Sequence, residues 1–378
     1  MKLNGRLGVA PGATAQTHIN SCSLARCSSP LKIFILKPSS LGDVVQALPV
    51  LRLLKLHWPD SRIYWWLDST LLPLLEGDPD LTGVVPFERR NWVAPTQLKK
   101  LWDTIRCLRA QQFDLVIDLQ CLARSGALGW LANGQLYIGL DEKREGARGF
   151  YDLVVRRPSY LTHAIDWYLG VLDLLDVPVH TDFVWLPAKP EVAAAVCAKW
   201  PLTARKLVTL LPGARWPTKR WPTPNFAALI RILADENREL QFAILGGQDA
   251  TNVGAELVNA APARCIDLTG KTTLPEMVEV LRLSSVVVSN DTGPMHVAAA
   301  LGRPVVALFG PTEPRRTGPY GQLENVLQAR LDCVPCMRAV CKYREQLACM
   351  RAIAPETVAA RVRQLVQDTG ALPKCTPV

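Results

Sequence analysis

The turn formed by Asp291, Thr292 and Gly293 combines the residue types and spacing with the most informative chemistry in this chain. It lies between the apolar run Val286–Val288 and a second apolar stretch that begins after His296, an order that predicts a buried strand, a tight polar turn and a helix start. Backbone amides at a helix start and the helix dipole both favour an anion. The turn therefore predicts a phosphate site, in which His296 either donates a hydrogen bond or has only a structural role.

A second candidate is the loop 37–43, which follows the apolar strand pattern Lys32–Leu36. Asp43 is the only acid of this loop and lies near the start of the next helix. A carboxylate there could act as a general base, provided that it reaches the hydroxyl group that it deprotonates. It could equally be a helix-start residue that interacts with the helix dipole. The local sequence leaves both interpretations open.

A third candidate is the loop Pro212–Pro222, which contains Lys219 and Arg220. Two adjacent positive charges at a fixed place could bind a diphosphate. The alternative is a basic surface loop that Trp216 and Trp221 cover with their amphipathic rings.

Four of the 11 cysteines form a cluster with the spacing Cys333-x2-Cys336-x4-Cys341-x7-Cys349. Only the first pair has the spacing of zinc ligands. We therefore predict a reduced or partly oxidised packed loop, with structural zinc as the weaker alternative. No secretion signal is recognisable, so a reducing cytoplasm is the expected compartment.

Alternating strand and helix patterns must position these loops. Because the strands are short and apolar, they predict an α/β fold of parallel sheets covered by helices on both faces, in two doubly wound halves joined near residue 190. Each candidate loop then lies at the carboxyl edge of a sheet, where such folds bind ligands. The expected strands are Lys32–Leu36, Ile63–Leu67, Leu115–Leu119, Leu207–Leu211, Gln241–Leu245, Val286–Val288 and Pro304–Phe309, and the expected helices include Leu98–Leu108, Phe226–Leu233, Leu274–Leu283 and Pro355–Val366.

Composition sets the broad class. The chain has 378 residues, 49% of them hydrophobic and 20% charged, which fits two globular domains. No stretch reaches the ~18 apolar residues of a membrane-spanning helix. Residues 1–31 read as a disordered extension or as the product of a start codon placed too early, and less well as a targeting segment.

The net charge of +9 favours an anionic partner. Seven basic residues and no acidic ones lie between Val192 and Ala234, although a scattered solvated face would give the same pattern. Nucleic acid is not favoured, because no recognition motif accompanies the charge. The chain also has no Walker loop and no G-x-G-x-x-G dinucleotide fingerprint.

Taken together, the motifs resemble those of glycosyltransferase family 9, the bacterial lipopolysaccharide heptosyltransferases. The resemblance covers about residues 32–368, and the clustered cysteines look more like the heptosyltransferase II branch. The matching pieces are Lys37-x-Ser39-Ser40-x-Gly42-Asp43-Val44, Pro212-Gly213-Ala214 with Lys219-Arg220-Trp221, Asp291-Thr292-Gly293-x-x-His296, and Gly310-Pro311-Thr312.

The resemblance implies a GT-B fold with two Rossmann-like domains facing a central cleft: an acceptor-binding domain over 32–190, an ADP-sugar-binding domain over 191–354, and a final helix within 355–378 that crosses back to the first domain. It implies inverting transfer from ADP-L-glycero-D-manno-heptose to a lipid-linked inner-core acceptor, with no metal and no cofactor. The enzyme would be cytoplasmic and peripheral to the inner membrane, with no transmembrane segment.

Carried over by motif, the resemblance makes Asp43 the general base and Lys219 the group that neutralises the departing diphosphate. Ala214 and Arg215 stand where the heptosyltransferase I branch has hydroxyl residues, which leaves the donor sugar open. A sugar-nucleotide epimerase or hydrolase, or a catalytically idle nucleotide-sugar binder, remain the alternatives. Donor contacts are expected from Lys219, Arg220, Asp291, Thr292, Gly293 and His296, and acceptor contacts from Ser40, Gly42, Arg89, Arg90 and Arg144.

Overall fold

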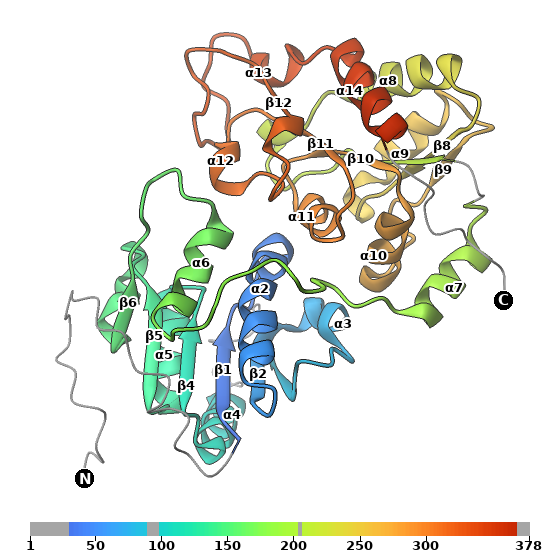
Figure 1. Ribbon diagram of the computed structural model, residues 1–378. Helices are drawn as coiled ribbons and strands as arrows, with labels where there is room; N and C mark the ends of the chain where they lie inside the picture. The colour runs from blue at the N-terminus through green and yellow to red at the C-terminus, as the bar shows by residue number, and fades with distance from the viewer. Residues whose placement is uncertain (1–29, 89–97, 203–205, 369–378) are drawn as a thin grey trace. The chain divides into compact units, whose positions relative to one another are not determined.

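The computed structural model describes residues 30–88, 98–202 and 206–368. The chain divides into two compact units, Met1–Trp185 and Leu186–Val378 (Figure 1). Each unit is built around one six-stranded sheet in which all neighbouring strands run parallel.

The sheet of the first unit has the strand order β3-β2-β1-β4-β5-β6. Its central strands are almost completely buried, because a parallel sheet covered by helices needs apolar side chains on both faces. The strands are β1 (Lys32–Leu36), β2 (Arg62–Asp68), β3 (Gly83–Phe87), β4 (Leu115–Asp118), β5 (Leu136–Leu140) and β6 (Leu153–Val155), and the helices are α2 (Leu41–His57), α3 (Leu72–Leu75), α4 (Leu98–Gln111), α5 (Ala123–Ala132), the 3-10 segment η3 (Arg144–Phe150) and α6 (Ala164–Asp173).

The sheet of the second unit has the order β12-β11-β10-β7-β8-β9. Read in reverse, from β9 to β12, its strands follow the same order as those of the first unit. Its strands are β7 (Lys206–Leu211), β8 (Leu240–Ile244), β9 (Cys265–Asp267), β10 (Val286–Asn290), β11 (Val305–Phe309) and β12 (Val326–Gln328), and its helices are α7 (Pro190–Lys199), α8 (Thr223–Glu236), α9 (Thr251–Val258), α10 (Leu274–Leu283), α11 (Gly293–Ala300), α12 (Pro314–Thr317), α13 (Ala348–Arg351) and α14 (Pro355–Asp368), with the 3-10 turn η4 (Pro217–Lys219).

Each sheet changes winding direction once. In the first unit the chain leaves β1 toward β2 on one side and returns to β4 on the other, and in the second unit β7 and β10 have the same relation. Ligands of open α/β sheets bind at the carboxyl ends of the strands at such a point. The three candidate loops follow β1, β7 and β10, so all lie at a switch point. Two Rossmann-like doubly wound domains are thus confirmed.

Helix α14 packs against α8, β10 and β11 of its own unit. The buried side chains Val358, Val362 and Val366 belong to the core of the second unit, together with Phe226 of α8. An amphipathic pattern predicts that a helix buries one face, but it does not identify the surface that covers that face.

No helix within the described part of the chain is long and apolar enough to cross a membrane. The expected strands agree with the observed ones to within about two residues at each end, and the Leu98–Leu108 and Leu274–Leu283 patterns correspond to α4 and α10.

Candidate active site

Lys37 links the two sides of the switch point in the first unit. This side chain is buried, and its Nζ donates a hydrogen bond of 2.8 Å to the carbonyl oxygen of Leu119, which follows β4. Nζ also lies 4.7 Å from the ring centre of Tyr168 on α6. Burial alone would lower the pKa of Lys37, but Tyr168 and the Asp43 carboxylate raise it. A charged Lys37 therefore holds the loops after β1 and β4 together.

Asp43 lies in the first turn of α2 and is half-buried. Its Oδ2 accepts hydrogen bonds from the Ser40 amide at 2.9 Å and from the Ser40 hydroxyl at 2.7 Å. These hydrogen bonds cap the start of α2, which agrees with the interpretation of Asp43 as a helix-start residue. The same bonds fix the carboxylate at the carboxyl edge of β1, beside the exposed Ser40 and the buried Gly42. Capping and base catalysis are compatible, because each carboxylate has two oxygen atoms.

The loop after β4 and the start of α5 each contribute one residue that the sequence did not single out. The Oε1 atom of Gln120 and the Nε atom of Arg124 are buried and have no hydrogen-bond partner among the residues that the structure describes. The Arg124 guanidinium lies 5.7 Å from the ring centre of Phe87. Buried polar atoms are normally paired, so orphaned atoms at a switch point mark a place for a ligand or water. No motif signals them, because an isolated Gln or Arg has no diagnostic spacing.

Arg144 is exposed at the start of η3, which packs against α5. The carboxylate of its neighbour Glu145 accepts a 3.1 Å hydrogen bond from the Ala123 amide at the start of α5. The Arg144 segment is therefore attached to the helix that carries Arg124. Arg89 and Arg90 lie outside the described residues.

Lys219 and Asp291 form the central ion pair of the second unit. Lys219 Nζ lies 2.7 Å from Asp291 Oδ2, and the two side chains are 18% and 7% exposed. The Thr312 hydroxyl, from the loop after β11, donates a 2.6 Å hydrogen bond to the same oxygen atom. The Lys219 ammonium also lies 4.8 Å from the Trp216 ring centre. Three loops at neighbouring strand ends thus hold one ammonium group in place.

Asn290 fixes the geometry of this ion pair. It is completely buried at the end of β10. Its Oδ1 accepts the Trp221 amide at 3.0 Å, and its Nδ2 donates to the Pro212 carbonyl oxygen at 2.7 Å. Both ends of the loop that carries Lys219 are therefore attached to the strand that leads into Asp291. The sequence analysis did not single out Asn290, because an amide side chain before the turn gives no separate signal.

Arg220 does not join Lys219. Its Nε donates a 2.8 Å hydrogen bond to the Ala214 carbonyl oxygen, and its terminal nitrogen lies 3.7 Å from the exposed Asp249 carboxylate. The structure therefore brings Lys219 and Asp291 together, while Arg220 closes its own loop and reaches toward the loop after β8.

Thr292 precedes α11 with an extended backbone, and Gly293 begins the helix. Both residues are half-buried, as is His296 one turn into the helix. The first amides of a helix have no partner within that helix, so the Asp291–Gly293 turn supplies donors beside the Lys219 ammonium. This combination of a cation and helix-start amides suits an anion with two or more charges.

The four clustered cysteines line one pocket of about 290 Å³, together with Thr218 and Pro311. Cys349 is buried, and burial together with the nearby thiols Cys333, Cys336 and Cys341 raises its pKa. Cys333, Cys336, Cys341 and Cys349 are free thiols. No set of three or more candidate ligands within the described residues has a geometry that would hold a metal ion. The packed-loop interpretation accounts for this arrangement, and zinc stays an untested alternative.

The segment 333–349, which carries the four cysteines, also contacts the loops that carry Lys219 and Thr312. The Thr218 hydroxyl donates a 2.9 Å hydrogen bond to the Arg338 carbonyl oxygen, and the Met337 amide donates a 2.7 Å bond to the Pro311 carbonyl oxygen. Thr218 directly precedes Lys219, a member of the ion pair, and Pro311 directly precedes Thr312, which bonds to Asp291. Each contact therefore holds the residue that comes just before one of these two.

Comparison with known proteins identifies the family. The model of glycosyltransferase family 9 (heptosyltransferase) matches residues 101–346, more than half of the chain. The lipooligosaccharide heptosyltransferase 2 of Haemophilus ducreyi is 31% identical over 322 residues, covering 79% of this chain and 88% of the relative. The lipopolysaccharide heptosyltransferase 1 of Pseudomonas aeruginosa is 27% identical over 366 residues, covering 89% and 98%.

The fold agrees with that assignment. The solved structure of the Escherichia coli ADP-heptose LPS heptosyltransferase II superposes with a TM-score of 0.72, at 24% identity, over 89% of this chain and 99% of that chain. The predicted family is therefore confirmed by a sequence match and by two domains of the expected topology. The chain belongs to glycosyltransferase family 9, the heptosyltransferase family.

Proposed function

We propose that this protein transfers heptose from ADP-L-glycero-D-manno-heptose to an inner-core acceptor of lipopolysaccharide, with inversion of the anomeric centre and without a bound metal. Family membership supports heptosyl transfer. The names of the relatives support a lipopolysaccharide or lipooligosaccharide acceptor, and that of the E. coli neighbour supports an ADP-linked donor. The enzyme would act at the cytoplasmic surface of the inner membrane, where a lipid-linked acceptor is accessible.

The Lys219–Asp291 ion pair beside the start of α11 is the observation that carries this proposal. An ammonium group has three donors, of which Asp291 uses one. The remaining donors and the helix-start amides of Thr292 and Gly293 would bind the ADP diphosphate, with His296 donating from the next turn. Because these charges are already positioned, they would stabilise the leaving diphosphate without reorganisation and without a metal.

Asp43 would act as the general base from the first unit. Ser40 holds Oδ2 in a fixed position, and the carboxylate would accept the proton of one acceptor hydroxyl. In an inverting transfer the base and the leaving group act on opposite faces of the sugar. On this proposal the base comes from one unit and the diphosphate site from the other.

The acceptor would bind at the switch point of the first unit. Ser40 and Gly42 lie at that edge, and Arg124 offers a buried nitrogen atom without a partner in the described structure. Inner-core acceptors carry anionic groups, for which a guanidinium is a fitting ligand.

Arg124→Ala is expected to raise the acceptor KM about tenfold or more while leaving ADP affinity unchanged, since a charge-assisted hydrogen bond contributes ~1.5–3 kcal/mol. Steady-state kinetics with varied acceptor measures this.

The decisive experiment is ADP release from ADP-heptose, with and without a heptose-deficient core acceptor, for the wild type, Asp43→Asn and Asp43→Ala. Acceptor-dependent release that both variants lose would support the transferase and its base. Asn retains an oxygen atom for the Ser40 bonds, so it separates loss of the base from loss of the cap. Full activity of Asp43→Asn would reject the base assignment. Release without acceptor would instead indicate a hydrolase or epimerase.

A further inference from the structure

Helix α4 presents two chemically different faces. Ile105 and Leu108 are buried in the core of the first unit, and the half-buried Leu101 packs beside them. On the solvent side, Lys99, Trp102, Arg106 and Arg109 are all exposed. Their spacing of three, four and three residues aligns these four side chains in one row, which we call the α4 stripe.

The exposure of Trp102, the aromatic residue of the α4 stripe, is unusual for a tryptophan on a helix surface that faces solvent. Trp102 is 62% exposed, whereas Trp65, Trp66 and Trp221 are buried in the cores of their units. A large apolar ring left in water on a helix that already buries its other face points to a surface that binds something.

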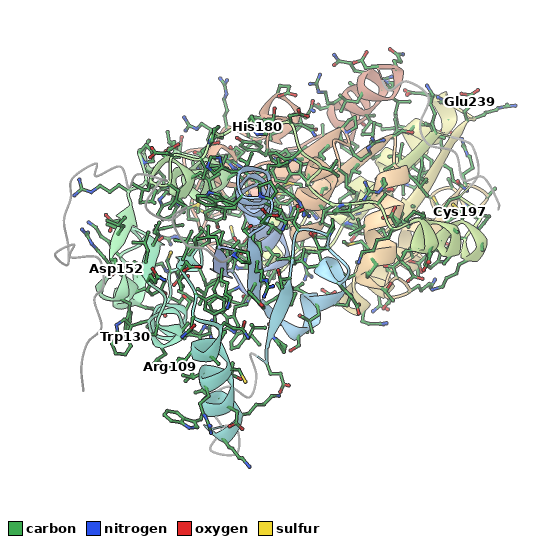
Figure 2. All side chains as sticks on the ribbon, turned by 60° about the horizontal axis from the view of Figure 1, so that its bottom comes forward. Arg109, Trp130, Asp152, His180, Cys197 and Glu239 are labelled. Carbon is green, nitrogen blue, oxygen red and sulfur yellow. The ribbon has the colours of Figure 1, made fainter. Side chains whose placement is uncertain are left out.

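A second exposed tryptophan lies close by. Trp130 on α5 is 47% exposed, and α5 packs against α4. Figure 2 shows Trp130 and Arg109 near each other on the same side of the first unit. Trp130 and the Arg109 end of the α4 stripe therefore lie on two adjoining helices.

The α4 stripe carries three basic side chains, and one exposed acidic residue, Asp103, lies four residues after Lys99 and three before Arg106 on the same helix. Among the residues that the structure describes, no acidic side chain pairs with Lys99, Arg106 or Arg109, while the neighbouring Lys100 pairs with Glu88 at 2.6 Å. Three cations without an ion pair in the described structure and one exposed indole therefore give the stripe a net positive charge and an apolar element.

We propose that the α4 stripe, together with Trp130, docks the protein onto an anionic phospholipid bilayer. Indole rings prefer the boundary between headgroups and acyl chains, and lysine and arginine are attracted by anionic headgroups. A nucleic acid would use the cations but does not explain two exposed indoles on a surface without a groove-reading motif. The inference rests on the proposed function, because a lipid-linked acceptor requires an enzyme at the membrane surface.

The test is flotation of the full-length protein with vesicles of phosphatidylcholine alone or mixed with phosphatidylglycerol. The wild type is expected to float with the anionic vesicles and to be released by high salt. Arg106→Ala with Arg109→Ala should weaken vesicle binding about 25-fold, since each basic residue near an anionic surface contributes about fivefold. Trp102→Ala should weaken it about tenfold through lost apolar burial.

The matched control is Arg231→Ala with Arg351→Ala, which removes the same charge from exposed positions of the second unit. Vesicle binding of this control should equal that of the wild type. Equal binding by the α4 variants, or no binding by the wild type, would overturn the proposal. Reversible self-association that the α4 variants abolish, or wild-type binding to duplex DNA in place of vesicles, would also overturn it.

An assay with a delipidated, water-soluble acceptor separates this proposal from the proposed function. The α4 variants should keep wild-type transfer to that acceptor and lose transfer only to acceptor embedded in anionic vesicles. If the wild type fails with both acceptors, the proposed function is wrong while vesicle binding still decides the docking surface.

Discussion

Lys219 and Arg220 are neighbours in the sequence whose side chains have different partners, and this difference predicts different roles. Lys219 contacts Asp291 beside the start of α11, while Arg220 contacts Ala214 and Asp249. We expect Lys219→Ala to weaken ADP binding about tenfold or more, because a hydrogen bond to a charged group contributes ~1.5–3 kcal/mol. We expect less than about threefold for Arg220→Ala, whose exposed ion pair contributes ~0–1 kcal/mol. Calorimetric titration with ADP measures both.

Equal losses in the two variants would show that both cations bind the diphosphate, as the sequence alone suggested. The sequence could predict that Lys219 and Asp291 meet at neighbouring strand ends, because the carboxyl ends of parallel strands share one edge. It could not predict that Thr312 and Asn290 hold them there, since those contacts depend on loop geometry that no spacing rule describes.

At the scale of elements, helix α12 has an acid-sensitive cap at Glu313. The Arg315 side chain and backbone amide both donate to the Glu313 carboxylate, and they lower its pKa. A lowered pKa means that the unfolded chain binds the proton more readily, so this stabilisation is present above the ordinary glutamate pKa and is lost as pH falls through the native value.

Glu313→Gln should therefore be less stable than the wild type at pH 7, and the difference should shrink as pH falls below about 4.3. Urea unfolding at a series of pH values measures this. The control is Glu324→Gln at an exposed position, for which the difference from wild type should stay small at every pH. A gap that widens in acid would contradict the assignment of the stabilisation to the ionised Glu313.

Helix α14 offers a second prediction for an element, one that concerns packing. Val362 is completely buried against the core of the second unit. Val362→Ala should lower the free energy of unfolding of that unit by about 2 kcal/mol, through lost apolar burial and a small cavity. Gln367→Ala, at an exposed position of the same helix, should change it by less than about 0.5 kcal/mol. Equal stabilities of the two variants would show that α14 does not depend on this contact.

Helix α14 also shows which structural features could be predicted from the sequence and which could not. Strands such as β1 and β7 were predictable because a strand buried on both faces must be a continuous apolar run between polar loops. The existence of α14 was predictable from its 3.6-residue period. Its partner was not, because Val358, Val362 and Val366 specify only that an apolar surface covers them. Arg124 was not predictable because what distinguishes it, a buried Nε atom without a partner among the described residues, is a property of the fold and not of the sequence.

For the molecule as a whole, the division into two units predicts which part of the chain ADP protects. The residues proposed to bind the diphosphate all belong to the second unit: Lys219, Thr292, Gly293 and His296. A ligand bound at 100 times its Kd stabilises the structure that binds it by ~2.7 kcal/mol. Amide hydrogen exchange of the wild type with saturating ADP should therefore slow in peptides spanning 212–221 and 289–296, and stay unchanged in the peptide spanning 37–43. If Lys219→Ala binds ADP tenfold more weakly, its stabilisation at the same ADP concentration should fall to ~1.4 kcal/mol, and Arg231→Ala should keep the wild-type protection. Protection confined to 37–43 would place the nucleotide in the first unit and reverse the proposed division between donor and acceptor.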